Sequence, residues 1–588
     1  MKRDIALECS RGTEMQIRQL KVTNFRGIAS LDWSPSLSFC CLIGPGDSGK
    51  STVLDAIEAT LSSRWLSFTE ADFIGGDTTK TIEIEVTVGE LSKALKSDER
   101  FGLYIRGWSA EGTIRDEAED GDEPVLTIRL TVDATLEPAW EICCDRIEDA
   151  RTLSNRDRAL FGLVRLAGED ARHLAWGQGS VLSRLTGNNE EASARLAQAY
   201  KAARDSAGLH EIEALMEAAT AAEGFAKGMG AYVEGAYAPG LELGRGGLSA
   251  GSIALHDEGV PLRMAGLGTR RLATLAIQKS AVSEGAIVLV DEIEHGLEPH
   301  RIMGAISQLR RDQTVASEAN CPVGQIILTT HSEVALAEAG ARSLFVCRTS
   351  RPDRATTVTK PAAPDPIHAL MRFNPRALFA RRILVSEGMT EVGMLNGLRE
   401  FWPPRHDDMP CEHKGASVAD GNGGQTVSMA LGLAQLGYSV AVFRDSDVPL
   451  TVEAVASLDE AGIPVFEYGG ELESEHALFS AASDQQVQLL LEYAREERGA
   501  GKINDNLLAA LDLDRVTIAG DFVVWELISA FDGRELREKI AGVFGAKKWF
   551  KDQRIGRGLA PIAWDIAMTS PESPIAVALA AAEAWLYA

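Results

Sequence analysis

The sequence predicts an α/β protein of two domains, and three observations carry this prediction. At 588 residues the chain is too long for a single hydrophobic core. The apolar run 39–43 feeds a glycine-rich turn that continues with helical spacing. Two later apolar runs, within 382–395 and 438–447, each end in carboxylates and are separated by a helical segment, which is the alternation of a parallel sheet.

Composition and charge exclude several classes of protein. A net charge of -26 argues against a generally basic nucleic-acid coat, so any DNA contact must use local patches or metal ions. The eight cysteines lack zinc-ligand spacing, which indicates a reduced, cytoplasmic compartment. Residues 1–14 are polar, and no run of 18 apolar residues occurs, so we expect neither secretion nor membrane insertion.

The glycine-rich turn is the most specific motif in the chain. Residues 44–51, GPGDSGKS, match the phosphate-binding pattern G-x-x-x-x-G-K-[ST] between a strand and a helix. Backbone N–H groups of such a loop surround an anion, the lysine reaches the β- and γ-phosphates of ATP, and the last hydroxyl binds Mg²⁺. The predicted ATP ligands here are Gly44, Gly46, Ser48, Gly49, Lys50, Ser51 and Thr52, with Ser51 also on Mg²⁺.

Alternating apolar and polar residues predict strands on both sides of this loop. The runs 15–25 and 28–33 lead into it as two antiparallel strands. Further strands are expected at 81–88, 103–105, 125–132 and 140–143, forming an antiparallel meander beside the nucleotide site. The acidic loop 116–123 is interpreted as a solvated hairpin tip without function.

The pattern becomes helical between residues 188 and 236, where Ala, Glu and Leu dominate. This stretch predicts a compact helical insertion, which serves either as an ordinary layer or as a dimerisation element. After a Gly/Ser-rich bridge at 240–251, the segment 262–277 places the small residues Ala265, Gly266, Gly268 and Thr269 at the start of a helix that carries Arg270 and Arg271.

Two more buried strands end in chemically useful residues. The segment 286–292, AIVLVDE, predicts a parallel strand that delivers Asp291 to Mg²⁺ and Glu292 to the attacking water. The segment 325–332, QIILTTHS, predicts another strand that ends at His331. This histidine resembles the switch histidine of ABC-type ATPases, which implies that it senses the γ-phosphate.

In this order, the motifs resemble the ABC-type ATPases related to RecF and SMC proteins. The opening LKVTNFRG (20–27) resembles their LxxxNFRG start, which implies that Arg26 contacts the nucleotide. The segment 262–277 resembles their signature helix, although it lacks the LSGG letters. In those ATPases the signature helix completes the site of the partner subunit, so the resemblance implies at least a homodimer. We expect an ATPase domain at 15–350 and a Pro-rich linker region at 351–380.

A second chemical centre is predicted in the domain at 381–588. One strand delivers Glu387, with Glu391 one helical turn later, and a second strand delivers Asp445 and Asp447. Carboxyl ends of parallel strands meet at one sheet edge, so we expect these four carboxylates to bind Mg²⁺ or Mn²⁺.

This second domain resembles the Toprim domain, in which a glutamate in an [LV]xEG context precedes a DxD motif. A P-loop ATPase followed by Toprim is the architecture of the OLD (overcoming lysogenization defect) nuclease family, which includes the Gabija nuclease subunit. By that resemblance, the segment 468–479 supplies a further metal ligand, for which Glu473 is preferred over Glu471 and Glu475. The basic segment 547–560 resembles the family's WFK element, which implies that Lys551 is catalytic.

The resemblance implies an ATP-regulated, metal-dependent DNA endonuclease in anti-phage defence that cuts by two-metal phosphodiester hydrolysis. It also allows for a helicase partner, which the sequence does not identify. The alternative is a RecF/SMC-like DNA clamp whose Toprim domain does not cut. A primase is disfavoured by the missing zinc cysteines, and a topoisomerase by the absence of an evident DNA-gate domain with a nucleophilic tyrosine.

Overall fold

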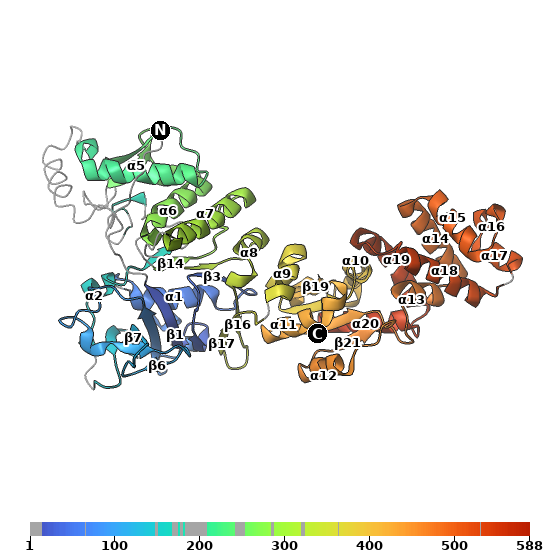
Figure 1. Cartoon of the computed structure of the whole chain (residues 1–588), viewed down its shortest axis with the longest axis horizontal. Helices are drawn as coiled ribbons and strands as arrows, with labels where there is room; N and C mark the ends of the chain where they lie inside the picture. Colours follow the sequence, from blue (N-terminus) through green and yellow to red (C-terminus); the bar gives the residue numbers. More distant parts are fainter. Residues whose placement is uncertain are drawn as a thin grey trace. The chain divides into compact units, whose positions relative to one another are not determined.

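The computed structural model divides the chain into two compact units, Met1–Lys360 and Pro361–Ala588. The residues it describes are 15–64, 66–147, 151–166, 174–176, 180, 182, 209–241, 253–283, 287–318, 324–362, 364–529 and 531–588. The predicted helical segment 188–208 and most of the bridge at 240–251 lie outside these residues. Each unit is described separately below (Figure 1).

A six-stranded sheet forms the centre of the N-terminal unit. Its order is β10 (Val164–Leu166), β14 (Ile287–Val290), β15 (Gln325–Thr329), β3 (Phe39–Ile43), β16 (Leu344–Thr349) and β17 (Thr356–Thr359), and all neighbours are parallel except the edge pair β16–β17. Strands β3, β14 and β15 are buried along their whole length, as their continuous apolar sequences require.

The second large sheet of this unit is antiparallel, and its main path runs β2-β1-β4-β7-β5-β6, with β8 paired to β7 and β9 paired to β8. This confirms the predicted meander. Its strands are β1 (Gln16–Phe25), β2 (Ile28–Trp33), β4 (Ile82–Gly89), β5 (Arg106–Trp108), β6 (Ile114–Arg115), β7 (Glu123–Val132), β8 (Pro138–Cys143) and β9 (Arg151–Thr152).

Two details of that meander differ from the prediction. The expected strand at 103–105 is wrong, because Gly102–Tyr104 forms a 3-10 turn that leaves Leu103 exposed, and the strand begins at Arg106. The acidic loop is not simply solvated. Asp116 pairs with Arg106 Nε at 3.0 Å, and the buried carboxylate of Asp122 pairs with Arg115 Nη1 at 3.2 Å, so the loop is tied to the sheet.

Helix α1 (Lys50–Leu61) packs against strands of both sheets, and it therefore joins the phosphate loop to the two layers. The remaining helices of this unit are α2 (Asn155–Ala159), α5 (Glu213–Gly228), α6 (Leu267–Ser283), α7 (Pro299–Glu318) and α8 (Glu333–Ala339). A small antiparallel sheet joins β11 (Tyr237–Leu241), β12 (Ile253–Asp257) and β13 (Val260–Pro261). Helix α5 lies in the predicted insertion and packs on α6 and β11.

The C-terminal unit contains a four-stranded parallel sheet of order β19-β18-β20-β21. Its strands are β18 (Arg382–Ser386), β19 (Ala416–Asp420), β20 (Ser439–Arg444) and β21 (Val465–Glu467). The first helices of the unit are α9 (Pro364–Phe373), α10 (Met389–Leu398), α11 (Thr426–Gln435) and α12 (Val452–Glu460). The predicted linker at 351–380 is thus largely ordered, because it includes β17 of the first unit and α9 of the second.

A helical layer follows the sheet and shares its hydrophobic core. It consists of α13 (Ser474–Ala481), α14 (Asp484–Arg498), α15 (Ala500–Leu511), α16 (Arg515–Ala519), α17 (Phe522–Ile528), α18 (Gly533–Lys547), α19 (Gln553–Thr569) and α20 (Pro574–Tyr587). Within the described residues, no helix combines the length and apolar character needed to span a membrane.

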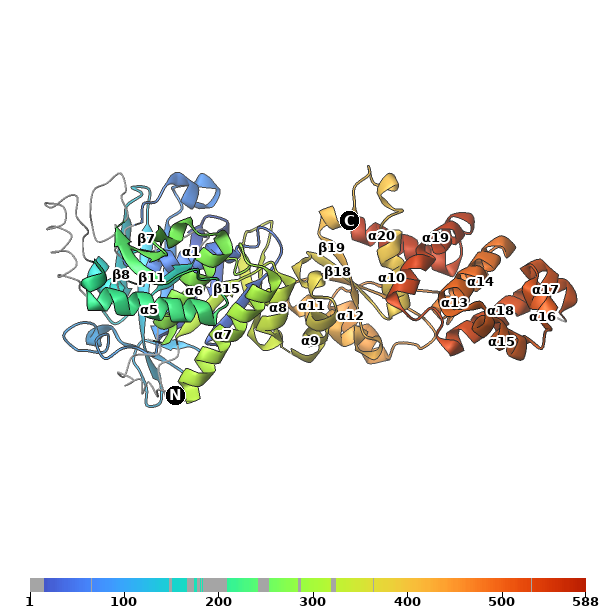
Figure 2. The ribbon, with the colours of Figure 1, turned by 90° about the horizontal axis from the view of Figure 1, so that it is seen from above.

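Helices α10 and α19 lie side by side in both Figure 1 and Figure 2. Small residues permit this close approach, since a Cβ on Gly393 would lie 2.2 Å from Gln553 O, and a Cβ on Gly556 would lie 2.4 Å from Thr390 O. The contact therefore docks the segment around residue 550 against the helix that carries Glu391.

Candidate functional site

The phosphate loop has the backbone that its glycines predict. Gly44 adopts φ 156°, and a Cβ there would lie 2.3 Å from Cys347 O, while Gly49 is left-handed at φ 89° and precedes α1. Lys50 folds across the loop, and its Nζ donates to Gly44 O at 3.1 Å and to Pro45 O at 3.0 Å. Burial lowers the pKa of Lys50.

The other predicted loop residues lie around this lysine. Ser48 is buried, with its Oγ 3.3 Å from Lys50 Nζ. A Cβ on Gly46 would meet no atom within 4 Å, so this glycine borders open space, and Thr52 lies half-buried in the first turn of α1. The loop thus presents its backbone around one lysine, which is the arrangement expected for phosphate binding.

Asp291 and Ser51 meet across the end of the parallel sheet, as predicted. Ser51 Oγ donates to Asp291 Oδ1 at 3.1 Å, and Thr329 Oγ1 donates to the same oxygen at 2.6 Å. The other carboxylate oxygen, Oδ2, accepts from Arg165 Nη2 at 2.9 Å. The two predicted Mg²⁺ ligands of the ATPase site are therefore neighbours, and the fit is favourable because both are oxygen donors.

Glu292 is held by its backbone while its side chain stays accessible. It adopts a left-handed φ of 45°, its N–H donates to Thr329 Oγ1 at 2.9 Å, and its carbonyl accepts from Arg271 Nη2 at 3.1 Å. Arg271 is buried in α6, the helix of the predicted signature segment. The Glu292 side chain is exposed, with Oε2 4.0 Å from His295 Nδ1, so a general base at this position can meet water.

His331 follows β15 in a turn fastened by Glu294. The backbone N–H of His331 donates to Glu294 Oε1 at 2.6 Å, and Thr330 Oγ1 donates to Glu294 Oε2 at 2.6 Å. Burial lowers the pKa of His331, and the charge of Lys50 adds to this effect, so the neutral imidazole is favoured at neutral pH.

Arg26 lies between two carboxylates: it forms ion pairs with Asp55 of α1 and, through Nε at 2.9 Å, with Asp72. Its side chain is more than a third exposed. Its contact with a nucleotide stays a prediction, and that contact requires Arg26 to give up or share at least one of these partners.

Glu391 and Asp445 come together in the C-terminal unit, although they are far apart in sequence. Ser474 Oγ donates to Glu391 Oε1 at 2.5 Å and lies 3.0 Å from Asp445 Oδ1. Burial raises the pKa of both carboxyls, and the charge of Glu391 raises that of Asp445 further. The first turn of α10 and the end of β20 therefore bring two carboxyls to one hydroxyl, while the shared metal site stays a prediction.

Glu475 is a third buried carboxyl close enough to feel the charge of Glu391. Glu475 is only 7% exposed, and burial together with the nearby charge of Glu391 raises its pKa to about 7. Glu473 stands at the N-cap position of α13 without a side-chain capping hydrogen bond, and its side chain is 40% exposed, with Oε2 3.8 Å from His476 Nδ1. Helix α13 begins directly after Glu473 and buries Glu475 in its first turn, so Glu475 joins Glu473 as a candidate ligand, and the choice of Glu473 stays a prediction.

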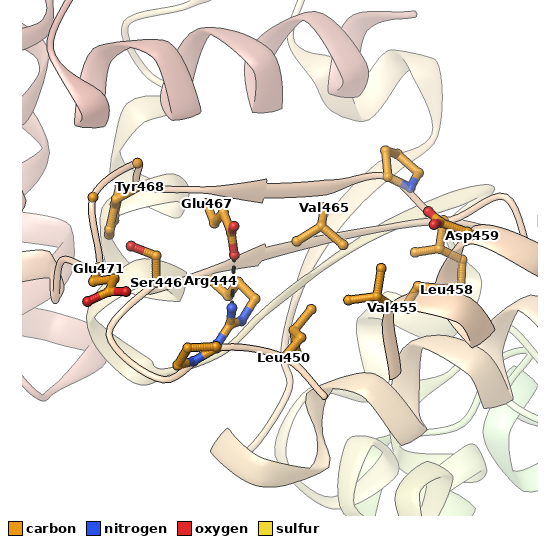
Figure 3. A pocket seen from close by; sticks show the side chains of 15 residues that line it. Arg444, Ser446, Leu450, Val455, Leu458, Asp459, Val465, Glu467, Tyr468 and Glu471 are labelled. Atoms are coloured by element: carbon orange, nitrogen blue, oxygen red, sulfur yellow. Dashed lines mark hydrogen bonds and ion pairs between the residues drawn. The ribbon is translucent and has the colours of Figure 1, made fainter. Parts of the chain in front are cut away.

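Glu387 is tied to an arginine on the neighbouring strand. Its Oε2 lies 3.3 Å from Arg444 Nε, and Arg444 Nη1 pairs with Glu467 Oε2 at 2.9 Å (Figure 3). Burial raises the pKa of Glu387, which Arg444 opposes. Arg444 and Glu467 also line a cavity of about 730 Å³ at the ends of β20 and β21. Asp447 is exposed, and its charge raises the pKa of Glu387.

Lys551 is exposed at a turn whose neighbours are anchored. Trp549 and Phe550 are buried, and Thr390 Oγ1 donates to Phe550 O at 3.1 Å. The charge of Lys551 acts on Glu391 and lowers its pKa, partly offsetting the effect of burial. The basic segment is therefore not a free surface turn, because its aromatic residues fix the lysine near the carboxyls.

We refer to Glu387, Glu391, Asp445 and Glu475 as the acidic cluster. Within the described residues, no three His, Cys, Asp or Glu side chains are close enough to hold a metal ion as they stand. The chemistry of the cluster nevertheless suits a divalent cation, because burial raises the pKa of its carboxyls and the positive charges of Arg444 and Lys551 offset this rise only in part.

Comparison with known proteins agrees with the first of the two sites. A family model described as "AAA domain, putative AbiEii toxin, Type IV TA system" matches residues 39–337, which is half of the chain. The chain belongs to this family. The match includes the phosphate loop, Asp291, Glu292 and His331, so the N-terminal unit is a P-loop ATPase domain of this family.

A curated relative of the chain is the OLD nuclease of Thermus scotoductus, which is 38% identical over 74 residues. This segment covers 12% of the present chain and only 14% of the relative.

Solved structures with a similar arrangement include two ATPase heads. One is the Smc head domain of Pyrococcus furiosus bound to the C-terminal domain of ScpA (15% identity, 59% of this chain, 96% of that chain, TM-score 0.36). Another is the recombination mediator RecF with ATP (13% identity, 59% of this chain, 100% of that chain, TM-score 0.34). At such TM-scores the similarities support no argument about the present chain.

Four residues of the two sites could not be predicted from sequence motifs. Arg165, Glu294, Arg444 and Ser474 belong to no motif, and each acts through a partner that is distant in sequence. Of these four residues, only Arg444 could have been noticed in the sequence. It stands at the end of an apolar strand, directly before Asp445, and an arginine is rarely buried without a charged partner.

Proposed function

We propose that the chain is an ATP-regulated, divalent-metal-dependent DNA endonuclease of the OLD type. The observation that carries this proposal is the acidic cluster at the carboxyl edge of a parallel sheet, with Lys551 nearby, in a chain that also contains a P-loop ATPase domain. The short match to an OLD nuclease adds support. By the same resemblance we assign the C-terminal unit to the Toprim class and the protein to anti-phage defence.

Each side chain has a role that follows from its position. Glu391, Asp445 and Glu475 are the inner ligands, and the Ser474 hydroxyl holds the first two close together by hydrogen bonds to both. Glu387, restrained by Arg444, is a fourth ligand at the rim, and Asp447 is available from solvent. Bound Mg²⁺ or Mn²⁺ would supply the polarisation of water and of the scissile phosphate. Lys551 would neutralise negative charge that develops on that phosphate.

Bound metal ions would also reduce the electrostatic repulsion between this acidic protein and DNA. With 85 acidic and 59 basic residues, the chain repels DNA on average. The acidic cluster is a poor site for a phosphate until cations balance it, whereas Lys547, Lys548 and Lys551 offer exposed positive charge beside it. DNA should therefore bind at this edge only with divalent metal present.

ATP is proposed to regulate cleavage by closing a homodimer of ATPase domains, with the α6 helix of one copy facing the phosphate loop of the other. The exposed side of the loop at Ser51 and the small residues before α6 are compatible with this arrangement. In this scheme the nuclease centre responds to the nucleotide through a change of assembly rather than through a shared residue.

Supercoiled plasmid distinguishes this proposal from a non-cutting DNA clamp. Purified protein is incubated with plasmid and Mg²⁺ or Mn²⁺, with and without ATP, and the products are separated on agarose. Nicked or linear DNA is expected for the parent and for Glu453→Gln, an exposed glutamate outside the cluster. Asp445→Asn should leave the plasmid intact. Intact plasmid with the parent protein under every condition would favour the clamp.

A further inference from the structure

Arg165 is a buried arginine that no motif explains. It lies on β10, which pairs in parallel with β14 so that Arg165 is opposite Leu289. Residues two apart on a strand share a face of the sheet, so Asp291 follows on the same face as Leu289. The register therefore places Arg165 beside Asp291, and its side chain is only 3% exposed there.

Helix α1 covers the same place with one of its faces. Ser51, Asp55 and Glu58 are spaced by four and three residues, so they lie in one row along the helix. Ser51 Oγ contacts Asp291 Oδ1 at 3.1 Å, while Asp55 Oδ1 and Glu58 Oε2 lie 2.5 and 3.5 Å from Arg165 Nη1. One guanidinium thus faces three carboxylates from two elements.

We propose that Arg165 is a positioning residue of the ATPase site, which fixes the orientation of Asp291 for Mg²⁺ and joins β14 to the phosphate-loop helix. Its Nη2 holds Asp291 Oδ2 while Ser51 and Thr329 hold Oδ1, so the carboxylate has no free rotation. The inference concerns ATP hydrolysis and is independent of the proposed nuclease.

The arrangement requires the fork of an arginine. Nη2 donates a hydrogen bond to Asp291 while Nη1 of the same planar group lies within ion-pairing distance of Asp55, and the single ammonium of a lysine cannot reproduce both contacts in this geometry. Positive charge is also needed, because Asp55, Glu58 and Asp291 would otherwise repel one another; burial already raises the pKa of Glu58.

Asp55 extends the arrangement to the predicted nucleotide contact. The same carboxylate pairs with Arg26, so an alternating series of charges runs from Arg26 through Asp55 and Arg165 to Asp291. A nucleotide that draws Arg26 away from Asp55 strengthens the hold of Asp55 on Arg165. The series thereby links occupation of the nucleotide site to the carboxylate that receives the metal.

The test is Arg165→Lys, which keeps the charge but loses the fork. Binding of a fluorescent ATP analogue is measured in EDTA and in Mg²⁺, together with the kcat and KM of ATP hydrolysis. We expect the affinity for the analogue in EDTA to stay within twofold of the parent. The increase in affinity that Mg²⁺ produces, called the Mg²⁺ gain below, should be at least fivefold smaller, and kcat should be at least tenfold lower.

Arg158→Lys is the matched control, because Arg158 is equally buried but binds Ser62 O and Asn155 without touching Asp291. It should lower thermal stability without changing kcat or the Mg²⁺ gain. The proposal is overturned if Arg165→Lys behaves like this control. If Arg165→Lys does not fold, Asp55→Asn replaces it in the test, because Asp55 is the carboxylate of α1 that lies nearest to Arg165. An unchanged kcat and an unchanged Mg²⁺ gain in Asp55→Asn would also overturn the proposal.

Discussion

Replacing Glu475 by glutamine should remove one part of the pH dependence of metal binding in the C-terminal unit; Asp445, whose pKa is raised to about 8, supplies another part, which the variant keeps. The pKa of Glu475 is raised to about 7, while a divalent ion binds the ionised carboxylate. At pH 6 only about one-tenth of such a group is ionised, and at pH 8 about nine-tenths are. The ionisation of this single residue therefore contributes a rise of about tenfold in affinity between these two pH values.

Calorimetric titration of Mn²⁺ into the full chain at pH 6, 7 and 8 measures this effect. In Glu475→Gln the ratio of affinities at pH 8 and pH 6 should fall by about tenfold, because the glutamine does not titrate. Glu473→Gln is the matched control, two residues away and 40% exposed, and it should keep the parent ratio. Equal pH dependence in the parent and in Glu475→Gln would refute the assignment of Glu475 as a ligand.

Stability without metal gives an independent readout of the same group. The folded-state pKa of Glu475 lies above the ordinary value of 4.5, so the native state binds the proton more tightly than the unfolded state. Its contribution to stability is complete below about pH 4.5 and is lost as the pH rises through about 7. The full difference corresponds to about 3 kcal/mol. In EDTA at pH 8, Glu475→Gln should therefore unfold at a higher temperature than the parent.

The remaining predictions separate the two sites. Lys50→Ala should abolish ATP hydrolysis in a phosphate-release assay by deleting the main positive contact to the phosphates, and Glu292→Gln should bind ATP but hydrolyse it at least tenfold more slowly; parental rates in both would misplace the nucleotide site. Light scattering of Glu292→Gln with ATP should show a dimer, and a monomer at micromolar concentration would contradict the assembly. Glu387→Ala and Asp445→Ala should each abolish plasmid cleavage, spare ATP hydrolysis, and combine non-additively. Lys551→Ala should lose cleavage yet bind Mn²⁺ with parental affinity, and full cleavage by this variant would exclude its catalytic role.

The sequence was sufficient where function depends on consecutive residues. The phosphate loop, the strand before Asp291 and the turn at His331 are contiguous patterns, and each lies where the pattern predicts. The strand ends at Glu387 and Asp445 were predictable for the same reason, because apolar runs of strand length end at these carboxylates.

Prediction failed where a side chain depends on tertiary contacts. The sequence does not distinguish the burial of Glu473 from that of Glu475, because the start of α13 leaves the first half-exposed and buries the second. Leu103 was assigned to a strand from its apolar neighbours, but the structure leaves it exposed in a 3-10 turn. Arg165 and Ser474 become informative only after β10 and α13 bring them to Asp291 and Glu391, respectively.

The contact between α10 and α19 also determines when the acidic cluster can be completed during protein synthesis. Thr390, beside Glu391, hydrogen-bonds to Phe550, which is 160 residues later in the chain. A ribosome working at about 5–20 residues per second needs on the order of ten seconds to make that interval. The ATPase unit, which ends at Lys360, is by then fully synthesised. A newly made copy can therefore fold its nucleotide site before Lys551 is synthesised, so the acidic cluster gains its nearby lysine only after the ATPase unit is complete.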